Sequence, residues 1–128
     1  MLNTIAIVLS SLAILLVFAG LAVARRPKRH VPLMYAAFTV DMIALAIVEL
    51  GPLFRGDVDP VTGLAREFEW AKTIHATLAT IAVIAYIVQI VNGRRILRGE
   101  RQFLPRHKRW AKIFLVFRLL AYGTMFTV

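Results

Sequence analysis

Two histidines precede two charged residues at the same spacing in this sequence. His30 lies eleven residues before Asp41. His30 stands at the start of an apolar run, and Asp41 lies inside that run. His107 lies eleven residues before Arg118 in the same way. A charge inside a membrane helix is costly and normally faces a partner or a water-filled cavity. Because the two charges have opposite signs, the spacing predicts an intramembrane ion pair between Asp41 and Arg118.

The alternative to pairing is that Arg118 reaches to the membrane surface and Asp41 is protonated. A lone guanidinium near the bilayer centre costs at least about 2.5–3.5 kcal/mol, which favours pairing. Such a pair commonly holds helices together, and less commonly serves as a proton relay or a ligand site.

His30 and His107 are also candidate cofactor ligands. Each follows an arginine in a basic segment. Two imidazoles from different helices are the minimum for axial haem ligation, and arginines suit the haem propionates. Met34 lies on the same helical face as His30 and is either a soft ligand or a packing residue. The alternative is that both histidines are solvated at the membrane surface.

His75 and Glu49 form a second candidate site. A rise of about 1.5 Å per residue places them at similar depth in two neighbouring helices. They are predicted either to share a metal ion, such as copper, or to form a hydrogen-bonded pair. The sequence has no cysteine, so thiolate metal sites, iron–sulfur clusters and disulfides are excluded. No nucleophile–base pair or phosphate-binding glycine loop is present, so we expect no enzyme activity.

Four apolar stretches must position these side chains. The chain has 128 residues, of which 59% are hydrophobic. A bilayer core about 30 Å thick needs about 20 helical residues, and each stretch is long enough. We therefore expect an all-α membrane protein, a single domain over residues 1–128 that forms a four-helix up-down bundle. The third helix is expected to end at Asn92-Gly93. The expected transmembrane helices cover about 2–24, 31–54, 70–92 and 108–127.

The charges predict the orientation of this bundle. The net charge is +9, and the first and third connections are basic, whereas the connection from Asp57 to Glu69 is acidic. The positive-inside rule places the basic connections in the cytoplasm and both termini on the other side of a bacterial inner membrane. Basic loops then account for the high positive charge without nucleic acid, and anionic lipid headgroups are their expected partners.

The matching spacings also favour an internal repeat. Each half of the chain has a basic segment, an Arg-His pair, a helix and a charge at the same offset. This pattern predicts a duplicated two-helix unit whose copies run in the same direction. A chance match of few positions is the alternative.

Three patches give the chain a family resemblance. They are Arg29-His30 with Leu33-Met34 and Ala37-Phe38, Ile74-His75 with Leu78-Ala79, and His107-Lys108-Arg109 with Ala111-Lys112. Tyr122-Gly123-Thr124 adds an aromatic, glycine and threonine ending. These patches resemble the small four-helix bacterial membrane proteins that include the CtaM-type cytochrome oxidase assembly factors. The family also has a histidine late in the second helix, where this chain has Glu49.

The resemblance implies a non-enzymatic inner-membrane factor that supports assembly of a haem–copper oxidase or insertion of its haem or copper. His30, His75 and His107 are the positions that would contact the cofactor. One alternative is an accessory structural subunit of a large respiratory or photosynthetic membrane complex. Another is a small proton or solute carrier that uses Asp41, Glu49 and Arg118.

Overall fold

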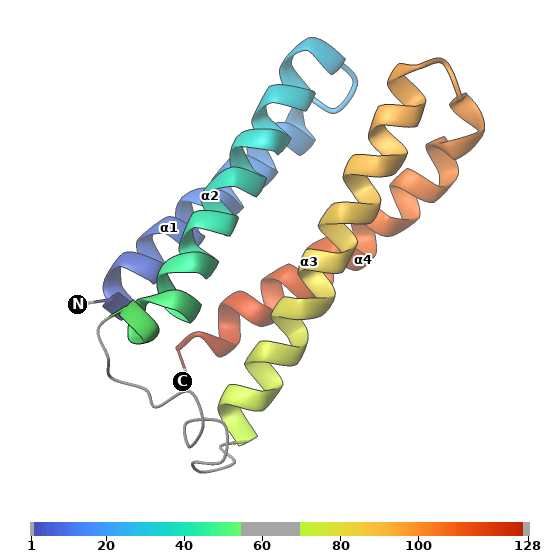
Figure 1. Ribbon diagram of the computed structural model, residues 1–128. Helices are drawn as coiled ribbons and strands as arrows, with labels where there is room; N and C mark the ends of the chain where they lie inside the picture. The colour runs from blue at the N-terminus through green and yellow to red at the C-terminus, as the bar shows by residue number, and fades with distance from the viewer. Residues whose placement is uncertain (1, 55–69, 127–128) are drawn as a thin grey trace. The chain divides into compact units, whose positions relative to one another are not determined.

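The described part of the chain consists of helices. The computed structural model describes the backbone of residues 2–54 and 70–126, and the side chains of residues 4–48 and 73–126. The chain divides into two compact units, Met1–Arg66 and Glu67–Val128. In each unit two helices pack side by side and are joined by a short turn (Figure 1). The single-domain organisation over residues 1–128 stays a prediction.

The first unit contains α1, Leu2–Ala22, and α2, Pro27–Phe54. The second helix begins at Pro27, four residues before the start predicted at residue 31. A proline at the first helical position loses no hydrogen bond, because that N–H has no partner inside the helix. The Arg26 carbonyl already accepts the backbone N–H of His30 at 2.9 Å. Pro27 therefore starts the helix.

The second unit contains α3, Trp70–Leu97, the 3₁₀ turn η1, Arg101–Phe103, and α4, Leu104–Thr124. The prediction that this third helix ends at Asn92-Gly93 is wrong. It ends before Gly99, which has a φ of +96°. The Gly99 N–H donates to the Ile96 carbonyl at 3.0 Å, and the Glu100 N–H donates to the Arg95 carbonyl at 3.1 Å. This pair of bonds is the Schellman helix ending, which needs the left-handed conformation that glycine adopts readily.

Three helices in the described part are long and apolar enough to cross a membrane. Their candidate spans are Thr4–Ala22, Pro27–Val48 and Thr73–Leu97. The fourth helix, α4, is not among them. It has 21 residues, but its sequence contains five cations: Arg106, Lys108, Arg109, Lys112 and Arg118. These charges lower the mean hydropathy of α4 below that of the other three helices.

Hydroxyl groups in the candidate spans find acceptors within their own helix. Thr39, Thr77 and Thr80 are exposed, and each donates to the carbonyl four residues earlier at 2.9, 2.8 and 2.7 Å. In hydrocarbon an unsatisfied polar group costs several kcal/mol, on the order of a lost hydrogen bond or more. In a membrane-spanning helix, these back-bonds would satisfy the hydroxyls of side chains that face lipid.

Candidate functional site

His30 joins the two helices of the first unit. Its Nδ1 lies 2.8 Å from the backbone carbonyl oxygen of Gly20. A carbonyl can only accept, so Nδ1 carries the proton and donates it. Gly20 belongs to the last turn of α1, where its carbonyl also accepts the backbone N–H of Val23 at 3.3 Å. The imidazole therefore caps α1 from α2, and its Nε2 is the ring nitrogen that remains for another contact.

Met34 packs on the same glycine. A Cβ placed on Gly20 would lie 2.6 Å from Met34 Sδ and 3.4 Å from Met34 Cγ. The thioether thus fills the space that the missing side chain of Gly20 leaves. His30 and Met34 come from one face of α2 and meet α1 at one residue, so the helices approach each other closely there.

His107 holds the corresponding place in the second unit. A Cβ on Gly93 would lie 3.5 Å from His107 Cε1 and 3.9 Å from its Nδ1. These are ordinary van der Waals separations. Gly93, which the sequence suggested as a helix end, lies inside α3 and faces the imidazole of α4. Both units therefore place the histidine of their second helix against a glycine of their first.

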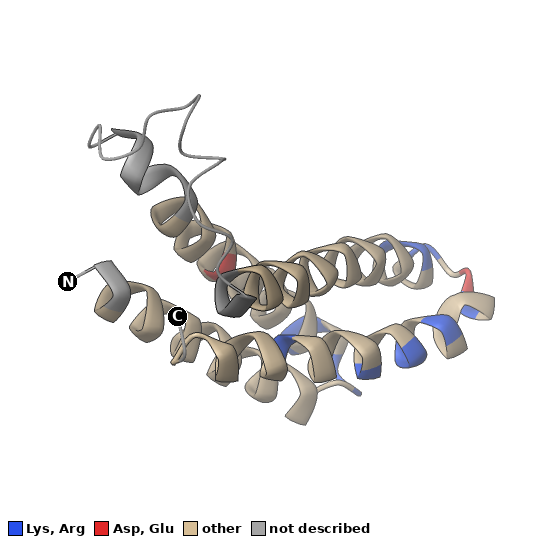
Figure 2. Ribbon diagram, turned by 90° about the horizontal axis from the view of Figure 1, so that it is seen from below, with Lys and Arg blue, Asp and Glu red and all other residues tan. Residues whose placement is uncertain are grey.

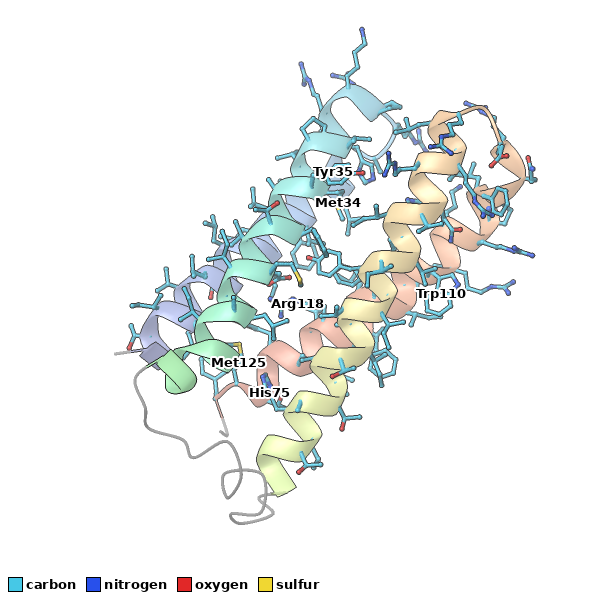
Figure 3. All side chains as sticks on the ribbon, in the orientation of Figure 1. Met34, Tyr35, His75, Trp110, Arg118 and Met125 are labelled. Atoms are coloured by element: carbon cyan, nitrogen blue, oxygen red, sulfur yellow. The ribbon has the colours of Figure 1, made fainter. Side chains whose placement is uncertain are left out.

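His75 joins the other end of the second unit. Its Nδ1 lies 2.8 Å from Thr124 Oγ1. The Thr124 hydroxyl donates to the Ala121 carbonyl at 2.8 Å. Its single proton is used in that bond, so its oxygen accepts from His75 and Nδ1 again carries the proton. The contact ties the first turns of α3 to the end of α4, where Figure 3 shows His75 near the labelled Met125.

The buried positions of α2 and α4 coincide when the helices are aligned on their histidines. Positions 7, 11 and 14 residues after the histidine are buried in both helices. All of these positions share one helical face. They are Ala37, Asp41 and Ala44 in α2, and Phe114, Arg118 and Ala121 in α4. The two charges of the predicted repeat therefore occupy equivalent buried positions.

The contact across the middle of the second unit is aromatic. The Tyr86 and Phe114 ring centroids are 4.1 Å apart, with 49° between the ring planes. Tyr86 lies seven residues before Gly93, and Phe114 lies seven residues after His107. The same two positions in the first unit are Ala13 and Ala37, both fully buried at 0% exposure. The spacing is shared, but the side chains differ greatly in size.

The predicted ion pair has both members buried, Asp41 at 9% exposure and Arg118 at 7%. They belong to different units, so their pairing stays a prediction. The haem-ligand pair His30 and His107 is likewise divided between the units and stays a prediction.

The predicted metal pair of His75 and Glu49 has the same standing. The Glu49 side chain lies outside the described residues, as does the whole acidic connection from Asp57 to Glu69. The structure places His75 against Thr124. Among the described residues, no group of three or more His, Cys, Asp and Glu side chains is arranged to hold a metal ion.

Sequence reasoning missed both glycines and the hydrogen bond to Thr124. Gly20 and Gly93 contact the second helix of their units. The sequence could have indicated this role, because small residues allow close approach of helices in membranes. The link between His75 and Thr124 has no local signal, because 49 residues separate them.

Comparison with known proteins adds no relative. No family model matches the chain, and neither does a curated protein or a solved structure.

Proposed function

We propose that this chain is a non-enzymatic integral membrane protein that supports assembly of a respiratory haem–copper oxidase or insertion of its cofactor. The hydrogen bond between His75 and Thr124 is the observation that carries the proposal. It joins two of the patches on which the resemblance to oxidase assembly factors depends, Ile74-His75 and Tyr122-Gly123-Thr124. Residues that match a family pattern at distant positions support a shared architecture more strongly when they are in contact.

The orientation of the imidazoles supports transient contact with haem or copper. His30 and His75 each donate the Nδ1 proton to a fixed acceptor within the protein. A histidine that binds a metal usually has one ring nitrogen held in this way, so that the other presents its lone pair. His30 and His75 would then each offer one oriented ring nitrogen to a metal. A single ligand of this kind suits a protein that binds a cofactor transiently and passes it on.

In this proposal all four helices cross a bacterial inner membrane, with both basic turns in the cytoplasm. The α4 residues after Lys112 carry one charge, Arg118, and its predicted pairing with Asp41 would offset the cost of burying it. The chain has no cysteine, so single introduced cysteines report topology without background. Gln102→Cys should react with an impermeant maleimide only from the cytoplasm, and Met125→Cys only from the other side. Reaction of both from one side would refute the fourth span.

The functional test is deletion of the gene, followed by measurement of oxidase activity and haem content in membranes. Loss of oxidase activity that the wild-type chain restores and His75→Ala does not would support the proposal. Unchanged oxidase activity would refute it. Purified protein with a Soret band that is lost in His30→Ala or His107→Ala would locate the haem contact.

An accessory structural subunit is the second candidate. Large apolar side chains are exposed along one row of α1, at Ile5, Val8, Leu12 and Leu15. Such a row fits a neighbouring transmembrane helix as well as lipid. Copurification with a large respiratory complex in fixed stoichiometry after gentle detergent extraction would favour this function over a transient assembly role.

A further inference from the structure

Basic residues concentrate around the turn between α3 and α4. The only acidic residue between positions 94 and 112 is Glu100. The cations in this interval are all exposed, and Figure 2 shows Lys and Arg gathered at the turn end of α3 and α4. They are Arg94, Arg95, Arg98, Arg101, Arg106, Lys108, Arg109 and Lys112.

An aromatic ring organises two of these cations. The guanidinium carbon of Arg95 lies 4.7 Å from the centroid of the Phe103 ring, and that of Arg106 lies 5.7 Å from it. Both distances are within the range of cation–π contacts. Arg95 comes from α3 and Arg106 from α4, so Phe103 of η1 brings one arginine from each helix to a single ring.

The backbone fixes this arrangement. Gly99 closes α3 with the two Schellman hydrogen bonds, and η1 leads directly into α4. Pro105 occupies the first turn of α4 and restricts its φ. A turn that is held before a ligand arrives loses less conformational entropy on binding.

The position of the turn identifies the ligand chemistry. It follows the candidate span Thr73–Leu97, so a membrane-embedded α3 places it where lipid phosphates lie. Trp110 is half-buried in the first turns of α4, and indole rings favour the membrane–water interface. Guanidinium groups bind phosphate oxygens through two parallel hydrogen bonds.

We propose that the turn between α3 and α4 is a binding site for the headgroup phosphate of an anionic phospholipid, with Arg95 and Arg106 as its ligands and Phe103 as the residue that holds them. This site is independent of the oxidase role proposed above.

The turn between α1 and α2 provides a matched control. It also carries exposed cations, Arg25, Arg26, Lys28 and Arg29, next to a candidate span. No Phe, Tyr or Trp lies between Gly20 and Leu33 to organise them. General attraction to an anionic membrane acts on both turns, whereas a built site exists only at the second.

The test is a titration of the full chain in non-ionic detergent with short-chain phosphatidylglycerol, phosphatidylcholine and inorganic phosphate. Native mass spectrometry counts the bound lipid. The variants are Arg95→Gln/Arg106→Gln, Phe103→Leu and the control Arg25→Gln/Arg29→Gln, each checked for native helix content by circular dichroism.

We expect phosphatidylglycerol to bind and phosphatidylcholine not to bind. At about 1 kcal/mol for each arginine, the Arg95/Arg106 pair change should weaken phosphatidylglycerol binding about thirtyfold. Phe103→Leu should weaken it about threefold, because the cation–π contacts are lost. The Arg25/Arg29 change should leave it nearly unaltered. Equal weakening by both double changes, equal binding of phosphatidylcholine, or inorganic phosphate binding as tightly as the lipid would overturn the proposal.

Discussion

The two hairpins, α1–α2 and α3–α4, share positions but differ in what fills them. Seven residues before the glycine and seven after the histidine, the first hairpin has Ala13 and Ala37. The second has the tilted, contacting rings of Tyr86 and Phe114 at those positions. Small residues allow helix backbones to approach closely, whereas two rings keep them further apart. Equivalent spacing therefore sets which residues are buried but leaves the helix separation to side-chain volume.

Gly20 and Gly93, the glycines that face the histidines, also differ in the space around them. A methyl group on Gly20 would meet Met34 Sδ at 2.6 Å, so something must move. A methyl group on Gly93 would meet His107 at 3.5 Å, an ordinary contact. An alanine at position 20 would thus displace Met34, whereas position 93 has room for alanine. The changes below test this difference between the hairpins.

The largest expected effect concerns the charges at the equivalent buried positions, Asp41 and Arg118. Arg118→Leu alone should reduce accumulation in the membrane more than Arg118→Leu combined with Asp41→Leu. Removal of one member of a buried pair typically costs about 3–5 kcal/mol, because the other charge stays buried without its partner. Immunoblots of membrane fractions measure the effect. Equal loss in the single and double variants would argue against pairing.

Phe114→Ala should destabilise the second hairpin by about 3 kcal/mol, because it leaves a cavity beside Tyr86. The mirror change, Ala37→Phe, should cost about 1–3 kcal/mol in the first hairpin through overpacking. Thermal unfolding in detergent, followed by circular dichroism, measures both. If Ala37→Phe left the melting temperature unchanged, the first hairpin would not be as tightly packed as Ala37 indicates.

Gly20→Ala should destabilise the protein by about 1–2 kcal/mol, because Met34 must leave its place. Gly93→Ala should be neutral or stabilise α3 by up to about 1 kcal/mol, since alanine favours the helix. The double change Gly20→Ala/Met34→Ala provides the control, because it removes the clashing thioether. If Gly20→Ala and Gly93→Ala shift the melting temperature equally, the proposed difference in packing fails.

The smallest effect is expected at the open end of the second hairpin. Thr124→Val keeps the side-chain shape and removes the hydroxyl that His75 uses, at a cost of about 1 kcal/mol. Thr124→Ser retains the hydroxyl and should behave nearly as wild type. The same melting experiment separates them. A loss in Thr124→Ser together with no loss in Thr124→Val would mean that the methyl group of Thr124, rather than its hydrogen bond, stabilises this end.

Much of the secondary structure was predictable from apolar length, but several helix boundaries required the structure. The predicted helices of residues 31–54 and 70–92 are observed as Pro27–Phe54 and Trp70–Leu97. The last helix, predicted over about 108–127, is observed as Leu104–Thr124. The sequence offers two glycines as ends for the third helix, Gly93 and Gly99. A glycine in a helix and a glycine that ends one look alike in the sequence, and the structure distinguishes them by the φ of +96° at Gly99 and the hydrogen bonds that close α3 there.

The candidate site was predictable in part. The histidines and the two charges stood out because polar groups are rare in apolar runs. Their shared offset of eleven residues predicted that Asp41 and Arg118 occupy equivalent positions in the two hairpins, and the burial of both side chains supports this. The partners of His30 and His75 were not predictable. A backbone carbonyl and a threonine hydroxyl carry no signal in the sequence that they accept a hydrogen bond from a particular imidazole.

The sequence by itself determined that this protein is helical, that two basic connections follow its first and third apolar stretches, and that polar residues recur at matching positions. Those properties depend on hydrophobic length and on the 3.6-residue period, which are local. Only the tertiary structure decided that Gly20 receives His30 and Met34, and that Tyr86 meets Phe114 where the first hairpin has alanines. Such contacts depend on how closely two helices approach, and that distance is set by the summed volume of side chains from both.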